Sequence, residues 1–331
     1  MRDVAQVAGV SLGTVSHVLS SAHYVRPETR ARVDAAIMEL GFRPNRVARA
    51  LVRHRTNTVG FVLPDITNPF FAELARGAED VLSEADYAAV LGNSDNDPVK
   101  ERRYLASFGE RGVDGLIVAI AAASHADDVR SLAERIPTVI VDRTLPGWRG
   151  DNVVGDNRTG MGLAVRHLSG LGHRRLALIN GDAHLSTASE RRLGFSQAVV
   201  AEGIADVSYS DGAFTFESGY QQAIALLDRS NRPTAVCAAN DLLALAVLSA
   251  ASDRGCTVPD ELSVVGYDDI AYAKLASPSL TTVRQPAYDM GAAAARLLLE
   301  RLRDERQSAR RLLVRPQLVV RGSTASPRTE T

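Results

Sequence analysis

The sequence predicts an all-α helix-turn-helix head followed by an α/β body made of two doubly wound parallel-sheet subdomains. Two observations support this prediction. Near the start of the chain, two short apolar helical patterns flank a turn that contains glycine and serine. From residue 58 onward, apolar runs of strand length alternate with amphipathic stretches of helix length. The length of 331 residues is also too great for one ordinary core, so several domains are expected.

The run DVAQVAGVSLGTVSHVL at residues 3–19 predicts two short helices joined by a sharp turn. Gly9 permits the positive φ that such a turn needs, and Ser11 is a good N-cap for the second helix. In that helix Val15, Val18 and Leu19 share one face, which we expect to pack inward. The opposite face is then available to enter a major groove, whose width admits one α-helix.

A third helix is expected from about Pro27 to Gly41. Its side chains that face the first two helices are Val33, Ala36, Ile37 and Leu40. A short helix is expected at 46–53, with a small apolar stripe along one side. A helix of this length is unstable alone, so we expect it to form only when it pairs with a second copy of itself on DNA.

The body contains two series of alternating strands and helices. The expected strands are 58–64, 87–93, 115–120, 138–143 and 152–156 in the first series, and 175–181, 207–212, 234–241 and 262–269 in the second. The expected helices are 71–86, 98–112 and 125–135 in the first series, and 159–171, 189–203, 217–229 and 241–254 in the second. Such alternation implies parallel sheets with helices on both faces.

The charge is distributed unevenly between the two parts. Residues 1–55 contain nine Arg and four acidic residues, a net charge of +5, so the remainder carries −6 of the total of −1. A basic head on a mildly acidic body fits DNA binding by the head and repulsion between the body and phosphate.

The sequence argues against metal and enzyme chemistry. Cys237 and Cys256 lack the spacing of metal ligands and are expected to be reduced, buried thiols. The glycines at 160 and 162 lack a third glycine and an acidic partner, so they are expected to serve helix packing and not dinucleotide binding. No nucleophile elbow, phosphate-binding loop or zinc spacing is present. We therefore expect neither an enzyme nor a cofactor, and the absence of a signal peptide or a long apolar run predicts a cytoplasmic protein.

Three motifs carry a resemblance to a known family. The run AGVSLGTVS at 8–16, VRPETR at 25–30 and GFRPNRVARAL at 41–51 resemble the lactose-repressor family of bacterial transcription regulators. The resemblance covers essentially the whole chain. It implies a homodimeric transcriptional repressor that binds palindromic operator DNA, with a body similar to a periplasmic sugar-binding protein whose lobes are connected by three crossings.

The domain boundaries follow from the patterns and the resemblance together. We expect a DNA-binding domain at 1–44, a hinge helix and linker at 45–57, and an effector-binding and dimerisation domain at 58–322. Within that last domain, lobe 1 takes about 58–156 and 286–313, and lobe 2 takes about 157–285 and 314–322. Residues 323–331 are small and polar and are expected to form a disordered tail.

The outward face of the second helix should read the bases. Leu12 offers only an apolar surface and Gly13 offers no side chain, so His17 is expected to carry much of the readout, with help from Thr14 and Ser16. The alternative is that His17 meets a phosphate. Arginines near the head are expected to anchor phosphates. The expected DNA-binding residues are Ser11, Leu12, Gly13, Thr14, Ser16, His17, Arg30, Arg46, Arg49 and Leu51.

By the resemblance, Leu51 enters the minor groove at the centre of the palindrome and kinks the duplex. The alternative is that Leu51 belongs to a small core between two hinge helices.

The resemblance to ribose-binding proteins selects a set of effector residues at strand ends and loops of the body. These are Asn68, Phe70, Phe71, Asp142, Arg143, Arg191, Phe214, Asn240, Tyr267, Asp268 and Gln285. Carboxylates accept from sugar hydroxyls, guanidinium and amide groups donate, and phenylalanine faces cover the C–H side of a sugar ring. Tyr267 replaces a phenylalanine of the pattern, so that wall of the site is open to question.

The resemblance therefore implies a repressor that is relieved by a small neutral sugar, with a ribose-like pentose favoured. Two other functions remain open at this point. A sugar phosphate could pair with Arg143 and Arg191, although Asp142 and Asp268 oppose a dianion. A secreted transport protein could use the same residues, although the basic head and the absence of a signal peptide argue against it.

Overall fold

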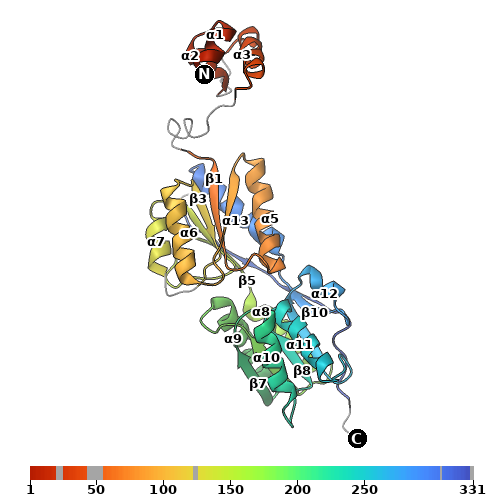
Figure 1. Cartoon of the computed structure of the whole chain (residues 1–331). Helices are drawn as coiled ribbons and strands as arrows, with labels where there is room; N and C mark the ends of the chain where they lie inside the picture. The colour runs from red at the N-terminus through yellow and green to blue at the C-terminus, as the bar shows by residue number, and fades with distance from the viewer. Residues whose placement is uncertain (20–24, 43–54, 122–125, 306–307, 329–331) are drawn as a thin grey trace. The chain divides into compact units, whose positions relative to one another are not determined.

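The computed structural model describes residues 1–19, 25–42, 55–121, 126–305 and 308–328. Two compact units are present, Met1–Thr56 and Asn57–Thr331. The first is the head and the second is the body, and each is considered by itself (Figure 1).

Three helices form the head: α1 (Arg2–Ala8), α2 (Leu12–Leu19) and α3 (Pro27–Glu39). Their core contains Val4, Ala5, Ala8, Val15, Val18, Val33 and Ala36. Ile37 packs against this core, but the prediction for Leu40 is wrong, because that residue follows the end of α3 and is exposed. The hinge helix expected at 46–53 lies outside the described residues.

Lobe 1 of the body contains a parallel sheet of six strands in the order β11-β5-β4-β3-β1-β2. Its elements are β1 (Thr58–Leu63), α5 (Pro69–Glu84), β2 (Ala88–Asn93), α6 (Pro98–Glu110), β3 (Gly115–Val118), α7 (Ala126–Ala133), β4 (Thr138–Val141), β5 (Asp151–Gly155), α13 (Ala287–Leu302) and β11 (Arg311–Val314). Alternate residues of the strands face two apolar layers: Ile117 packs in the layer of α5 and α13, whereas Leu116 and Val118 pack in the layer of α6 and α7. Helices therefore cover both faces, as predicted (Figure 1).

Lobe 2 repeats the arrangement with the strand order β12-β10-β9-β8-β6-β7, in which only β12 runs antiparallel to its neighbour. Its elements are α8 (Asn157–Gly170), β6 (Arg175–Asn180), α9 (Ser186–Ala201), β7 (Asp206–Asp211), α10 (Phe216–Leu227), β8 (Ala235–Ala238), α11 (Asp241–Asp253), β9 (Ser263–Asp268), α12 (Ala271–Leu275), β10 (Thr281–Arg284) and β12 (Gln317–Val319). Helices α8 and α9 pack on one face of the sheet, and α10 and α11 on the other. Cys237 and Cys256 are buried free thiols in this lobe.

The chain passes between the lobes after β5, after β10 and after β11. Helix α13, which follows the second crossing, lies beside α5 of lobe 1 (Figure 1). The sequence reading contained no element for α13, although it is an amphipathic helix of ordinary length. A hydrogen bond from Thr144 N to Ser186 Oγ, 2.9 Å long, also connects the two lobes directly.

The prediction of a disordered tail from Ser323 is wrong for residues 323–328, and residues 329–331 lie outside the described part of the chain. Ser323 is buried, and its hydroxyl donates to Val264 O at 2.6 Å and accepts from Thr281 N at 2.8 Å. His173 contacts Ala325 O at 2.9 Å. Small polar residues here satisfy backbone groups of lobe 2 that would otherwise be buried without partners.

Candidate DNA-binding and effector sites

The turn of the head is fixed by backbone geometry and by one arginine. Gly9 ends α1 with φ 61°, a conformation that side chains disfavour. Arg32 of α3 donates to the carbonyl oxygens of Ala8 and Gly9, at 3.0 Å from Nε and 2.8 Å from Nη2 respectively. The third helix therefore holds the turn that separates α1 from α2.

One face of α2 is exposed and polar. The Ser11 hydroxyl accepts from Thr14 N at 3.1 Å and so caps the helix. The exposed residues of this face are Leu12, Gly13, Ser16 and His17, while Val15 and Val18 on the opposite face are buried. The head thus presents one exposed helix side, which is the geometry that a major-groove reader requires.

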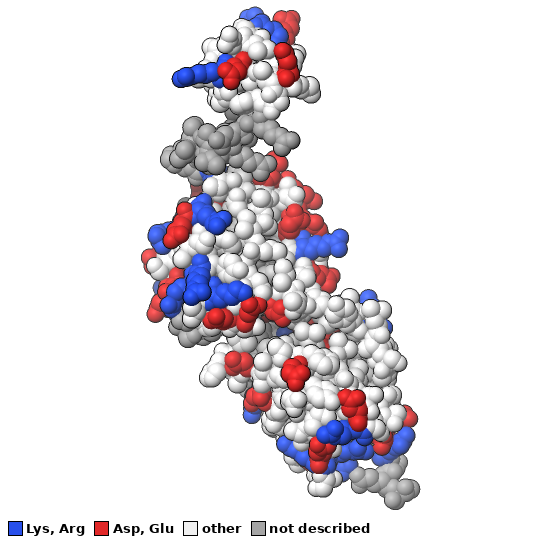
Figure 2. All heavy atoms as spheres, viewed as in Figure 1, with Lys and Arg blue, Asp and Glu red and all other residues white. Residues whose placement is uncertain are grey.

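The predicted phosphate anchors are only partly described. Arg30 belongs to α3, and its guanidinium reaches the end of α2, where it donates to Val18 O at 3.4 Å. Arg46, Arg49 and Leu51 lie outside the described residues. On the face of the body drawn in Figure 2, positive and negative side chains intermix. In lobe 1, for example, Arg102 and Asp128 form an ion pair of 2.8 Å.

In the body, the structure brings nine of the eleven predicted effector residues to one cavity at the ends of strands from both lobes. The residues that line it are Asp65, Asn68, Phe70, Phe71, Asn96, Asp142, Arg143, Thr187, Arg191, Phe214, Thr215, Asn240 and Asp268. Ligands in open α/β sheets bind at the carboxyl ends of the strands, where these residues lie. The cavity measures about 40 Å³, room for about three water molecules, so even a monosaccharide requires its walls to part.

Lobe 1 contributes an aromatic pair and an ion pair. The Phe70 and Phe71 rings meet edge to face, with centroids 5.1 Å apart. Asp142 follows β4 with φ 65°, an unusual conformation for a residue with a side chain, and its carboxylate lies 3.8 Å from Arg143 Nε. Both side chains are buried.

Lobe 2 is organised around Arg191, which is the sixth residue of α9 because that helix begins earlier than predicted. The guanidinium donates to Asn157 Oδ1 at 2.8 Å and to the Ala239 carbonyl, and lies 3.5 Å from Asp268 Oδ1. It also stacks 3.9 Å above the Tyr267 ring.

Tyr267 and Gln285 lie behind the wall and do not line the cavity. Tyr267 is fully buried beneath Arg191, and a Cβ on Gly160 would meet its hydroxyl at 2.2 Å. Gln285 Nε2 donates to Asp268 Oδ1 at 2.9 Å. Tyr267 therefore supports the guanidinium of Arg191, and Gln285 orients the carboxyl group of Asp268, from outside the cavity.

Asn68 and Asn240 each serve two purposes. Asn68 Oδ1 caps α5 by accepting from Phe70 N at 3.1 Å, and Asn240 Oδ1 caps α11 by accepting from Leu243 N at 2.9 Å. The caps use the oxygen atoms, so the Nδ2 amides are left to donate to a ligand.

Burial governs the ionisation of the cavity. Burial raises the pKa of Asp268 to about 7, although Arg191 and the hydrogen bond from Gln285 lower it. Burial also raises the pKa of Asp142, against the opposing charges of Arg143 and Arg191. The site therefore sets two carboxyl groups against two guanidinium groups in a small, poorly hydrated space.

Four lining residues were missed by sequence reasoning: Asp65, Asn96, Thr187 and Thr215. Each lies in a turn or at a helix start, where Asp, Asn and Thr are common for local reasons. Only their position, shortly after a strand or close in sequence to a predicted effector residue, could have identified these four residues.

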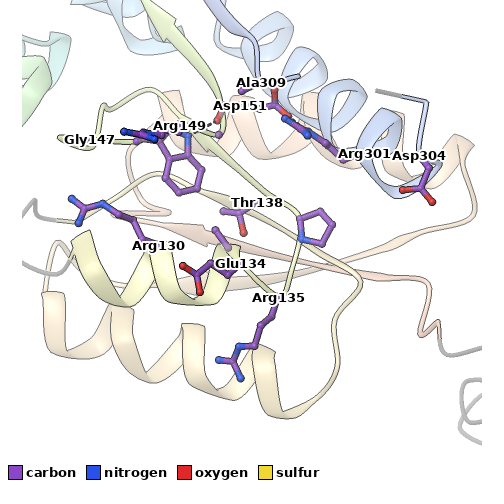
Figure 3. A pocket seen from close by; sticks show the side chains of 14 residues that line it. Arg130, Glu134, Arg135, Thr138, Gly147, Arg149, Asp151, Arg301, Asp304 and Ala309 are labelled. Carbon is purple, nitrogen blue, oxygen red and sulfur yellow. Dashed lines mark hydrogen bonds and ion pairs between the residues drawn. The ribbon is translucent and has the colours of Figure 1, made fainter. Parts of the chain in front are cut away.

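A larger hollow of about 790 Å³ lies entirely on lobe 1, near Arg130, Trp148 and Arg301 (Figure 3). It is open, and exposed charges of both signs line it, including Arg149 and Asp304. Because no residue of lobe 2 contributes, a ligand there would not bridge the lobes. The buried cavity with converging polar groups is therefore the better candidate for an effector site.

Comparison with known proteins identifies the family. Residues 1–45 match the pattern of bacterial regulatory proteins of the lacI family, and residues 165–324 match the periplasmic binding protein-like domain. The ribose operon repressor of Bacillus subtilis is 40% identical over 299 residues, which cover 90% of each protein. The chain belongs to the lacI family. A second relative, the transcriptional repressor PurR of Photobacterium profundum, is 36% identical over 328 residues, 98% of each protein.

Solved lacI-family structures agree with the fold. A lac repressor dimer bound to operator and an anti-inducer has a TM-score of 0.89 at 27% identity and covers 98% of both chains. A lacI-family regulator from Enterococcus faecium with bound ribose has a TM-score of 0.75 at 33% identity, covering 81% of this chain and 99% of that one.

These comparisons settle the class of the protein. It is a DNA-binding transcriptional repressor of the lacI family and not an enzyme. A secreted transport protein would not carry the regulator pattern matched at 1–45. Within the described residues, no helix has the length and apolarity to span a bilayer, and no group of metal-ligating side chains comes together.

Proposed function

We propose that this repressor responds to a ribose-like neutral monosaccharide bound in the cavity between its lobes. The observation that carries the proposal is the convergence of Asp142, Arg143, Arg191 and Asp268, all buried, on one cavity. Two carboxyl groups can accept from paired hydroxyls while guanidinium and amide groups donate. Because the cavity walls must part for any sugar, a monosaccharide requires less opening than a disaccharide.

The relatives support this ligand class without deciding it. A ribose operon repressor and a ribose-bound regulator are similar to this chain, but so is a PurR repressor. The rings of Phe70 and Phe214 suit the apolar face of a sugar.

A sugar phosphate is the second candidate, because Arg143 and Arg191 are cations in the cavity. Their hydrogen bonds argue against it. Arg143 already donates to Ile120 O at 2.5 Å, and Arg191 already donates to Asn157 Oδ1 and to the Ala239 carbonyl. A dianion would also lie beside two carboxyl groups.

We propose that the DNA-bound form is a homodimer, since a twofold operator requires a twofold protein. Two apolar surfaces of the body are available for the contact. Val90 and Leu91 are 40% and 44% exposed on β2, an edge strand, and Tyr272 and Leu275 are 49% and 78% exposed on α12. Sedimentation of the full chain would show a monomer if these surfaces had no partner.

On DNA, we assign base readout to the exposed face of α2, with His17 as the main reader. Leu51 acts as the wedge at the operator centre. Leu51→Ala should lower operator affinity by about 1–3 kcal/mol and leave sugar binding unchanged, because only the unstacked base step is affected. Unchanged operator affinity would exclude the wedge.

The sugar should act as an inducer. It contacts both lobes, so it changes their relative angle, and the Thr144–Ser186 hydrogen bond between them must adapt. Separated hinge helices would then melt. With a coupling of about 1–3 kcal/mol, operator affinity falls roughly 5–150-fold, and DNA weakens sugar binding by the same factor.

Calorimetry with ribose, other pentoses, hexoses and ribose 5-phosphate tests the effector. We expect a neutral pentose to bind and the phosphate to bind more weakly. No binding of any neutral monosaccharide at millimolar concentration would refute the assignment of the cavity. A gel shift at several salt concentrations, with and without the sugar, shows whether the sugar weakens or strengthens operator binding. If the sugar strengthens it, the binding site stands but the sugar is not an inducer.

A further inference from the structure

Glu101 is a buried acid that does not line the effector cavity. It lies in the first turn of α6 (Pro98–Glu110) and is 1% exposed. An ionised carboxylate is costly to bury, so its retention there calls for a specific interaction.

Glu101 interacts with a single peptide group shortly after β3, the one that joins Ile120 to Ala121. Ala121 N donates to Glu101 Oε2 at 2.5 Å, and Arg143 Nη1 donates to Ile120 O at 2.5 Å. The carbonyl of Ile120 and the amide of Ala121 belong to the same planar peptide group and point in opposite directions. Glu101 and Arg143 therefore hold the two ends of one peptide.

This arrangement links the acid to the cavity. A peptide between a carboxylate and a guanidinium is polarised by both, so each hydrogen bond strengthens the other. The peptide is itself buried, with Ile120 and Ala121 2% and 3% exposed, so loss of the carboxylate removes the acceptor of a buried amide. Arg143 lines the cavity at the far end of this chain.

We propose that Glu101 is a positioning residue of the effector cavity: its carboxylate orients the Ile120–Ala121 peptide, whose carbonyl holds the guanidinium of Arg143. The proposal rests on the proposed function only in that the ligand of Arg143 is taken to be the sugar. Glu101 does not touch the ligand itself.

Two variants and one matched control test the role. Glu101→Leu removes the acceptor and should weaken ribose binding about tenfold, because the Ala121 amide is left unpaired and Arg143 loses its fixed carbonyl. Glu101→Gln keeps an acceptor oxygen and should weaken binding only about threefold. Glu110→Leu, at the exposed end of the same helix, should leave affinity unchanged. Calorimetry gives the affinities, and thermal melting confirms that each variant is folded.

The pH profile separates positioning from simple support of the fold. Burial raises the pKa of Glu101 to about 7, while the Ala121 hydrogen bond and the Arg143 charge lower it. Arg143 in turn faces Asp142, Arg191 and Asp182. The acid accepts best when ionised, so wild-type affinity should fall as the pH drops through 7. In Glu101→Gln the fall should be shallower, with the remainder due to Asp268.

A measurement without sugar keeps this proposal distinct from the proposed function. In protein labelled with ¹⁵N-alanine, the Ala121 amide proton should resonate downfield and exchange slowly, and both properties should be lost in Glu101→Leu. If the wild type binds no sugar, the effector assignment fails while this signal still reports on Glu101. If Glu101→Leu binds ribose like the wild type, or the Ala121 signal is unaltered, the positioning role is wrong.

Discussion

The head and the body place their working side chains in opposite environments. On the head, the proposed readers Leu12, Ser16 and His17 lie on an exposed helix face. In the body, Asp142, Arg143 and Arg191 are buried. Exposed side chains contribute to binding without supporting the fold, whereas buried charges do both, so the two regions should respond differently to substitution.

The largest effect is expected at Arg191, where binding and folding are inseparable. Arg191→Ala leaves the Asp268 carboxyl and the Ala239 carbonyl without their cation and should lower the free energy of unfolding of the body by about 3–5 kcal/mol. Arg192→Ala is the matched control, since Arg192 is only half-buried, pairs with Asp211 and lies 4.6 Å from the Tyr209 ring centroid, and should cost about 1 kcal/mol. Urea denaturation measures the free energy of unfolding of both variants. If both lose the same stability, the expected difference between the buried arginine and its control is wrong.

His17→Ala should show the reverse behaviour. It should lower operator affinity by about 1–3 kcal/mol, the value of one base contact, while thermal stability changes much less because the side chain is exposed. Gel shifts at fixed salt measure the affinity, and Met38→Ala, on an exposed position of α3, is the control. If His17→Ala binds the operator as tightly as the wild type, base readout belongs to Thr14 and Ser16 and not to His17.

A smaller effect, on the fold of the head alone, is expected at Ser11. Ser11→Ala removes the cap of α2 and should destabilise that helix by about 1 kcal/mol. Amide exchange at Thr14 in the full chain should then be roughly fivefold faster. Ser16→Ala, in the middle of the same helix, should not alter exchange, and a similar acceleration there would argue against capping.

The smallest expected effect is on the pH dependence of stability, through His173 and its contact with Ala325 near the end of the chain. Burial lowers the pKa of His173, which contacts Thr234, Ser263 and Ala325. A lowered pKa means that the unfolded state binds the proton more readily, so stability is full above pH 6.5 and decreases as the pH falls toward the folded pKa. The melting temperature of the wild type should therefore drop more between pH 7 and 5 than that of His173→Gln. His184→Gln, at an exposed position, should behave like the wild type.

Periodicity and turn residues predict much of this fold. Strand–helix alternation indicates both sheets, and the Gly9 and Ser11 positions indicate the helix-turn-helix, because these signals are local. The effector set depended on the resemblance, since Asp142, Arg191 and Asp268 are far apart in the sequence and only the fold brings them together.

What sequence reasoning missed depends on tertiary contacts. The difference between Asp268, which lines the cavity, and Tyr267, which lies behind it, follows from strand register. Ser323 is a small polar residue whose burial is decided by distant backbone groups. Glu101 has the sequence context of an ordinary surface acid near a helix start, and only the packed peptide beyond β3 reveals its environment.

The paired duty of Asn68 and Asn240 has an evolutionary consequence. Aspartate caps a helix about as well as asparagine, so an Asn→Asp exchange at either position keeps the helix cap. The same exchange replaces the free amide donor in the cavity with a charged acceptor. A single-atom substitution can thus invert one contact of the site while the helix cap is kept, which gives descendants of this repressor a short mutational route to a different effector.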